Sequence, residues 1–158
     1  MIISKLSLLL MSIFILVSCI NTKVTKEGEY FKTINYKFFK DFKPNEEVLI
    51  DKIDNKYSVI QINKSDLSLS DFTQIDNKLK KDGWRIISAK NNFFEYCFGE
   101  KIYLGALFPE KEKYRNFAGN EVLPFNQKKW LVILSYSEGK VNYCRNDELE
   151  NIELEYLW

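Results

Sequence analysis

The residues with the most chemical potential in this sequence are its three cysteines, Cys19, Cys97 and Cys144, and its 22 Asp and Glu side chains. Histidine is absent from all 158 residues, which excludes histidine triads, histidine general bases and histidine metal ligands. A pair of carboxylates could still hydrolyse glycosides, but no spacing in the sequence selects two of them. We therefore predict no catalytic residue, no cofactor and no metal site.

Residues 1–18 have the pattern of a secretory signal peptide. Lys5 is the only charged side chain before Lys23, and the stretch from Leu6 to Val17 is apolar apart from two serines. A basic start followed by about a dozen apolar residues is typical of such leaders. The stretch is too short for a comfortable membrane span, which needs ~20 apolar residues. We therefore expect the leader to direct export.

The end of this leader, Leu16-Val17-Ser18-Cys19, resembles the lipobox of bacterial lipoproteins. The resemblance implies cleavage before Cys19, a diacylglyceryl group on its thiol and acylation of the new amino terminus. Two or more acyl chains hold a protein stably on a membrane, whereas one holds it only marginally. Ile20 stands where an Asp commonly retains lipoproteins of Gram-negative bacteria in the inner membrane. In such an organism the resemblance implies the outer membrane.

The two remaining cysteines, Cys97 and Cys144, are an even pair in an exported chain. Such a pair predicts a disulfide, which closes a loop with a sequence separation of 47 residues. Metal binding is the weaker alternative, because two thiols make an incomplete site. Beyond the leader the acidic and basic side chains are equal in number, so no basic stripe favours nucleic acid.

The pattern of apolar residues predicts one domain, residues 29–158, joined to Cys19 by a tether over residues 19–28. Period-two alternation and turn residues predict strands over residues 29–39, 48–53, 57–62, 84–89, 93–98, 101–108, 129–136, 141–144 and 152–158. The apolar run Trp130–Leu134 indicates a central strand covered on both faces. Seven aromatics between Trp84 and Phe108 could form a sugar-stacking platform, but packing within the sheet is the favoured interpretation.

One helix is predicted over residues 69–82. Ser68 and Asp71 form a capping box before it, and Leu69, Phe72, Ile75 and Leu79 fall on one face. The fold class is therefore α+β: a mostly antiparallel sheet of about eight or nine strands with one helix packed on a face.

The segment 109–127 is the longest break in this pattern. Loops of this length inside a compact domain are uncommon and often functional. A binding surface would be sought here first, and a short helical turn on the surface is the alternative.

The function that these features favour is that of a lipid-anchored envelope protein, with a non-catalytic binding or interaction module. Its expected partners are the membrane, through Cys19, and an envelope protein or secreted protein, but not nucleic acid. One alternative is an immunity protein or hydrolase inhibitor, since Phe94–Gly99 resembles the Cys-and-Gly strand turn of lipoprotein lysozyme inhibitors. Another is a carboxylate-based cell-wall hydrolase.

Overall fold

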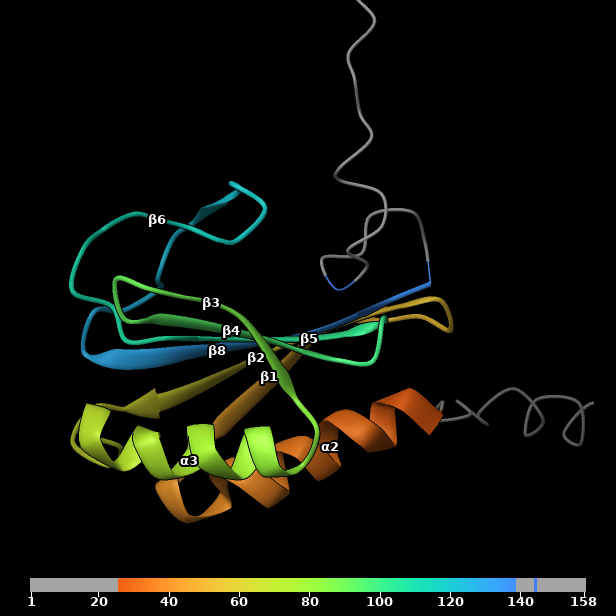
Figure 1. Ribbon diagram of the computed structural model, residues 1–158, viewed down its shortest axis with the longest axis horizontal. Helices are drawn as coiled ribbons and strands as arrows, with labels where there is room; N and C mark the ends of the chain where they lie inside the picture. The colour runs from red at the N-terminus through yellow and green to blue at the C-terminus, as the bar shows by residue number, and fades with distance from the viewer. Residues whose placement is uncertain (1–25, 139–143, 145–158) are drawn as a thin grey trace, which may run out of the picture.

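The computed structural model describes residues 26–138 and residue 144. One antiparallel sheet has two helices on one face and a small hairpin on the other (Figure 1). The sheet has the spatial order β1 (Asn45–Asp51), β2 (Asn55–Asn63), β8 (Lys129–Ser137), β5 (Ile102–Leu107), β4 (Phe93–Phe98) and β3 (Arg85–Lys90). The other elements are helices α2 (Lys26–Phe39) and α3 (Leu69–Lys81), the 3-10 turn η1 (Lys40–Phe42), and strands β6 (Tyr114–Arg115) and β7 (Glu121–Val122).

The sequence alternation before Pro44 predicted a strand, and this prediction is wrong. Helix α2 occupies residues 26–39 and begins inside the segment expected to be a tether. Phe31, Ile34 and Phe38, at most 6% exposed, are spaced three and four residues apart on one helical face that packs into the core. Tyr36, which alternation placed beside Ile34 and Phe38, is 67% exposed. Both periods exist in this segment, and the structure buries the residues that follow the helical period.

Helix α3 confirms the one predicted helix, with its last residue at Lys81 where residue 82 was expected. The Ser68 side chain accepts a hydrogen bond from the backbone N–H of Asp71, and the Asp71 carboxylate accepts one from the Ser68 backbone. Phe72, Ile75 and Leu79 are buried against the sheet. The helix is also fixed by a polar contact, because Tyr96 Oη donates to Asp76 Oδ1 at 2.8 Å. Burial, and then this contact, raise the pKa of Tyr96 far above its usual value.

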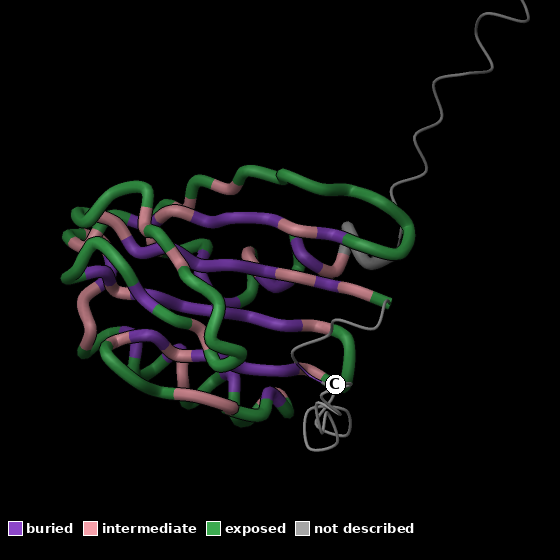
Figure 2. Tube along the Cα trace, turned by 90° about the horizontal axis from the view of Figure 1, so that it is seen from above, coloured by how far each residue is buried: buried purple, intermediate pink, exposed green. Residues whose placement is uncertain are grey.

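Strand β8 confirms the prediction of a central strand covered on both faces. It pairs with β2 on one side and β5 on the other. Trp130, Val132 and Leu134 pack toward the helices, and Leu131 and Ile133 pack toward the opposite face. Figure 2 shows buried residues concentrated along the inner strands, with exposed residues along the rim. Each fully buried aliphatic side chain contributes ~1.5–3 kcal/mol to folding, so this strand is a major source of stability.

The α+β class is confirmed in its coarse form, but the numbers of elements differ. The described part has six strands in the main sheet, two in the small hairpin and two α-helices. The hairpins expected around residues 54–56, 91–92 and 99–100 are all present. Asn91 and Asn92 both have positive φ angles, as tight hairpin turns require. The strands predicted over 141–144 and 152–158 lie largely or wholly outside the described residues, as do the leader, Cys19 and Ile20.

Cys97 and Cys144 are joined in a disulfide, with their Cα atoms 5.5 Å apart. Cys97 lies in β4, next to the edge strand of the sheet. Arg85 Nη2 donates to the backbone oxygen of Cys144 at 3.2 Å, and this contact adds to the attachment of Cys144. Within the described chain, neither helix has the length and apolar character needed to cross a membrane.

Candidate functional site

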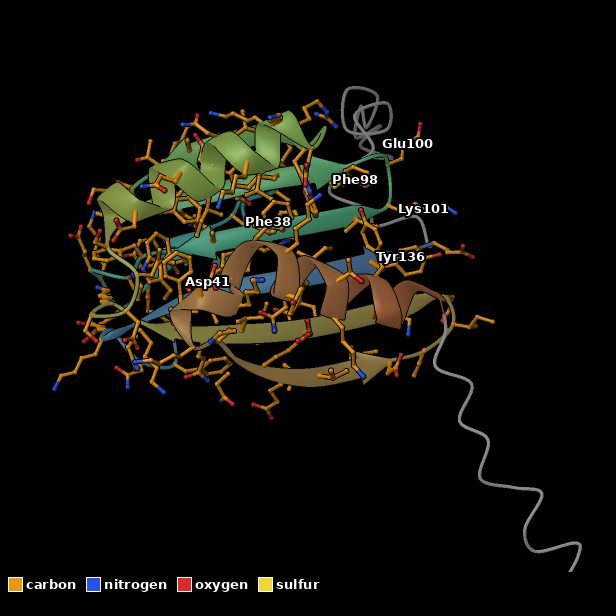
Figure 3. The ribbon with its side chains drawn as sticks, turned by 90° about the horizontal axis from the view of Figure 1, so that it is seen from below. Phe38, Asp41, Phe98, Glu100, Lys101 and Tyr136 are labelled. Carbon is orange, nitrogen blue, oxygen red and sulfur yellow. A yellow bond between two sulfur atoms is a disulfide. The ribbon has the colours of Figure 1, made fainter. Side chains whose placement is uncertain are left out.

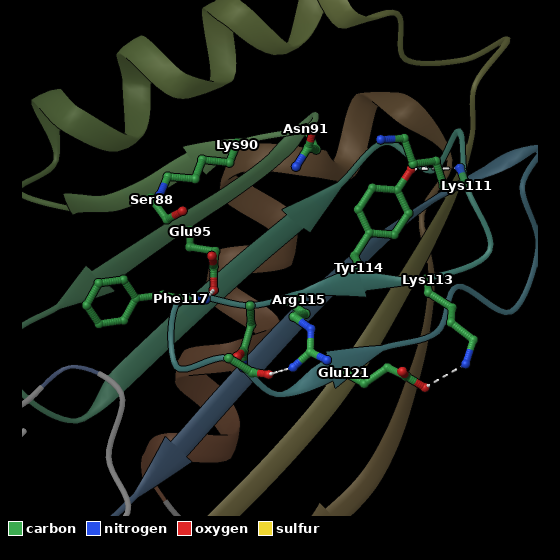
Figure 4. A pocket seen from close by; sticks show the side chains of 12 residues that line it. Ser88, Lys90, Asn91, Glu95, Lys111, Lys113, Tyr114, Arg115, Phe117 and Glu121 are labelled. Carbon is green, nitrogen blue, oxygen red and sulfur yellow. Dashed lines mark hydrogen bonds and ion pairs between the residues drawn. The ribbon is translucent and has the colours of Figure 1, made fainter.

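A hollow of about 680 Å³ lies between strands β3 and β4 and the loop that carries β6 and β7. The loop that carries β6 and β7 lies on the face of the sheet opposite the helices (Figure 1), and the hollow that it lines is therefore on that face. Its volume falls in the ~300–1,000 Å³ range of ligand sites. Its lining combines a buried carboxylate with exposed basic, amide and aromatic side chains; the ones used below are Lys90, Glu95, Lys111, Lys113, Arg115 and Phe117 (Figure 4).

Glu95 is the carboxylate at the base of this hollow, and it is 1% exposed. Side chains alternate along β4, so Glu95 shares a face with Phe93 and Cys97, which are buried in the core on that side. Its Oε1 atom accepts hydrogen bonds from Tyr103 Oη at 2.7 Å and from the backbone N–H of Phe117 at 2.9 Å. A buried carboxylate is costly without such donors. Within residues 26–138 and 144, no donor reaches its other oxygen, Oε2, and Glu95 is part of the lining of the hollow.

Gly105 makes this arrangement of Glu95 possible. It lies directly opposite Glu95 in the β4–β5 pair. A Cβ atom at Gly105 would stand 2.7 Å from Tyr103 Oη, 3.0 Å from Phe93 Cε2 and 3.1 Å from Tyr103 Cε1. Carbon and oxygen atoms do not approach so closely without displacement. The missing side chain therefore lets the Tyr103 phenol extend toward the carboxylate that it supports.

The loop over the hollow is held in place by hydrogen bonds at its base and at its tip. At the base, Tyr114 is 6% exposed and its Oη accepts the backbone N–H groups of Glu110 and Lys111. At the tip, the Asn116 side chain and backbone oxygens accept the backbone N–H groups of Asn120 and Gly119. Gly119 has a φ of +82°, which favours glycine at this turn. These hydrogen bonds hold the backbone N–H of Phe117 in the position from which it donates to Glu95 Oε1.

Lys64 also ties the start of the loop to the sheet. Its Nζ donates to the backbone oxygen of Pro109 and lies 3.8 Å from the centre of the Phe108 ring. Burial lowers the pKa of Lys64, and Glu110 partly opposes that effect. This contact anchors the loop on the side away from its tip.

The rim of the hollow is strongly basic. Lys90, Lys111, Lys113 and Arg115 all line it and are exposed. Lys113 pairs with Glu121 at 3.5 Å, but within the described residues no carboxylate lies within ion-pair distance of the other three. Arg115 instead donates to the backbone oxygen of Gly119 at 3.0 Å. Three unpaired cations therefore surround one half-satisfied carboxylate, an arrangement suited to recognising a ligand that offers both an anion and hydrogen-bond donors.

A second hollow, of about 590 Å³, lies at the end of the sheet beside the start of α2. Figure 3 shows Phe98 and Tyr136 here, with the charged side chains of Glu100 and Lys101 pointing outward. Tyr30 and Ile102 complete its apolar part. Among its described lining residues no charged side chain is buried, so it lacks the directed polar group that distinguishes the first hollow.

The residues predicted from sequence are distributed unevenly with respect to this site. Cys97 lies two residues from Glu95 on the same face of β4, but neither cysteine of the disulfide is part of the lining of the hollow. The loop 109–127, where a binding surface was expected, forms the wall, and it contains a strand pair, not a helical turn. The seven aromatics from Trp84 to Phe108 pack mainly in the core.

Sequence reasoning missed Glu95, Tyr103 and Gly105. The detectable signal was the acidic residue at an inward position of β4, between Phe93 and Cys97.

No protein-family model matches this chain, and no curated protein or solved structure is significantly similar to it.

Proposed function

We propose that this protein is a lipid-anchored envelope protein whose domain is a non-catalytic binding module, with the hollow under the 109–127 loop as its binding site. The observation that carries the binding site is Glu95, a buried carboxylate in the lining of the hollow, with Oε1 hydrogen-bonded to the fold and no donor from the described residues on Oε2. Burying a charge opposes stability unless its partners compensate. A free oxygen at the base of a basic hollow is therefore best explained by a ligand.

The lipid anchor is supported by the lipobox-like Leu16-Val17-Ser18-Cys19 at the end of an apolar leader. In producing cells fed labelled palmitate, Cys19→Ala should abolish labelling and detergent partitioning. Cys144→Ser, which removes a cysteine of the disulfide in place of the lipobox cysteine, should keep both. Labelling of the Cys19→Ala protein would contradict the anchor.

The binding site is tested by a photocrosslinking side chain placed at Phe117, in the full-length protein in its own envelope. Phe117 is 47% exposed and lines the hollow; Tyr36, 67% exposed on α2 on the other side of the sheet, is the matched control. We expect a discrete adduct from position 117 that position 36 does not give. The same adducts from both positions, or none from position 117, would contradict the site.

A second candidate, the inhibitor or immunity protein, is favoured by the part of the same loop that follows β7. Leu123 and Phe125 are 55% and 69% exposed, and exposed apolar side chains on a projecting loop are common anchors in protein interfaces. If this candidate is correct, the adduct formed at position 117 should be a protein, and Phe125→Ser should weaken its capture. A small-molecule adduct would favour the binding module instead.

A further inference from the structure

We propose that the ligand of the hollow is an acidic sugar, a pyranose that carries a carboxylate. This proposal rests on the proposed function, because it assigns a ligand class to the same site. Three independent features of the hollow support it: the free oxygen of Glu95, the unpaired cations at the rim, and the exposed ring of Phe117.

The base of the hollow requires a hydrogen-bond donor. Glu95 Oε1 already accepts two hydrogen bonds, whereas Oε2 accepts none from the described residues. An ionised carboxylate accepts hydrogen bonds but donates none. A simple anion without donors would meet only repulsion from Glu95. A sugar hydroxyl supplies the donor without adding charge.

The rim of the hollow requires an anion. The lining carries four cations, Lys90, Lys111, Lys113 and Arg115, against the carboxylates of Glu95 and Glu121. A cationic ligand would be attracted by Glu95 but opposed by the larger number of positive charges. Arg and Lys side chains bind carboxylates through charge-assisted hydrogen bonds. The ligand therefore has its donor at the base and its carboxylate at the mouth.

The third feature, the ring of Phe117, distinguishes a sugar from a smaller zwitterion such as an amino acid. The hollow, of about 680 Å³, accommodates a ring of pyranose size or a short oligosaccharide. Phe117 is half exposed at its edge and offers an apolar surface to the C–H face of such a ring. An acidic sugar uses all three features at once, whereas a small amino acid uses only the charges.

The test is calorimetric titration of the mature lipidated protein in detergent micelles with glucuronate, glucose and acetate. Glucuronate has both a hydroxyl-bearing pyranose ring and a carboxylate, whereas glucose has only the ring and acetate only the carboxylate. We expect glucuronate to bind at least about tenfold more tightly than either. Glu95→Gln should weaken glucuronate binding by about tenfold or more, because it removes the charge of the acceptor. Lys111→Met should also weaken it, whereas Lys81→Met, an exposed lysine on α3, should leave it unchanged.

Each other outcome overturns the assignment. Acetate binding as tightly as glucuronate would reduce the hollow to a simple anion site. Glucose binding equally well would remove the role of the rim cations, and no binding of the three would exclude the ligand class. Because Lys111 is exposed, loss of binding in Lys111→Met cannot be ascribed to misfolding. Crosslinking from position 117 reports on the binding module separately, so it can succeed while the sugar assignment fails.

Discussion

Replacing Gly105 with alanine should displace Tyr103 and weaken the support of the buried Glu95. The new Cβ would lie 2.7 Å from Tyr103 Oη and 3.0 Å from Phe93 Cε2. Both rings are at least 96% buried, so neither can turn outward without opening the core. The displacement should break the 2.7 Å hydrogen bond from Tyr103 to Glu95.

The size of this effect follows from three contributions. Overpacking a well-packed core costs ~1–3 kcal/mol, and losing a hydrogen bond to a charged group costs ~1.5–3 kcal/mol. Against these, replacing glycine stabilises by ~0.4–1 kcal/mol through the unfolded chain. We expect Gly105→Ala to lower the free energy of unfolding by about 2–5 kcal/mol.

Urea unfolding of a double-mutant cycle with Tyr103→Phe tests this reasoning. Phenylalanine at position 103 removes both the closest oxygen and the hydrogen bond to Glu95. Gly105→Ala should then cost at least ~1 kcal/mol less than it does beside tyrosine. Equal costs in the two backgrounds, or a cost below ~0.5 kcal/mol in the native background, would refute the proposed role of Gly105.

Three further predictions concern parts of the molecule outside the hollow. Replacing Cys97 and Cys144 together by serine should lower the free energy of unfolding by ~2–5 kcal/mol, since the bridge joins residues 47 apart; unchanged urea stability would contradict this. The hydrogen bond from Tyr136 lowers the pKa of Glu138 below its usual value, so Glu138 adds stability that is present above the usual pKa and lost as pH falls through the lowered pKa. In NMR titrations Tyr136→Phe should raise the pKa of Glu138; an unmoved value would be inconsistent with this contact. Ser68→Ala, which removes the cap of α3, should cost ~0.5–2 kcal/mol in urea unfolding, and a cost near zero would show that the capping box adds little.

Local sequence patterns correctly predicted two kinds of element. One is held by contacts between residues close together in the chain, and the other is so uniformly apolar that it must be buried. The capping box at Ser68 and Asp71 determines where α3 begins, because both groups belong to its first turn. Trp130–Leu134 is apolar at every position, so it had to be covered on both faces. These features depend on neighbours along the chain or on one strong apolar run.

Helix α2 could not be assigned in the same way, because two periods overlap in its sequence. Ile34, Tyr36 and Phe38 alternate as a strand would, while Phe31, Ile34 and Phe38 follow helical spacing. Whether this segment forms a helix or a strand depends on which set of apolar side chains can pack against the rest of the domain. Phe31, Ile34 and Phe38 pack in the core and Tyr36 is exposed, so the helical set is the one that packs. That information is tertiary.

The candidate site was even less accessible to sequence analysis. Glu95, Gly105 and the backbone of Phe117 come from three separate segments, and their relation appears only when β4 pairs with β5 and the loop folds back. The loop itself could be singled out by its length and composition. The acidic residue that it covers could be noticed only as an exception to the alternation of β4.

Whether Glu95 serves the fold or a ligand can be decided by removing its charge and its buried partner together. Glu95→Met alone should destabilise the protein by ~1–3 kcal/mol, because it removes the carboxylate that accepts the hydrogen bond of the buried Tyr103 hydroxyl. Adding Tyr103→Phe removes that hydroxyl, while the backbone N–H of half-exposed Phe117 can turn to water. Apolar groups of similar shape in place of a buried polar pair are often neutral. We expect the double variant to recover to within ~1 kcal/mol of the native stability in urea unfolding and still to lose glucuronate binding. A double variant that remains several kcal/mol less stable would show that the carboxylate is held for the fold, and the case for a ligand would lose its main support.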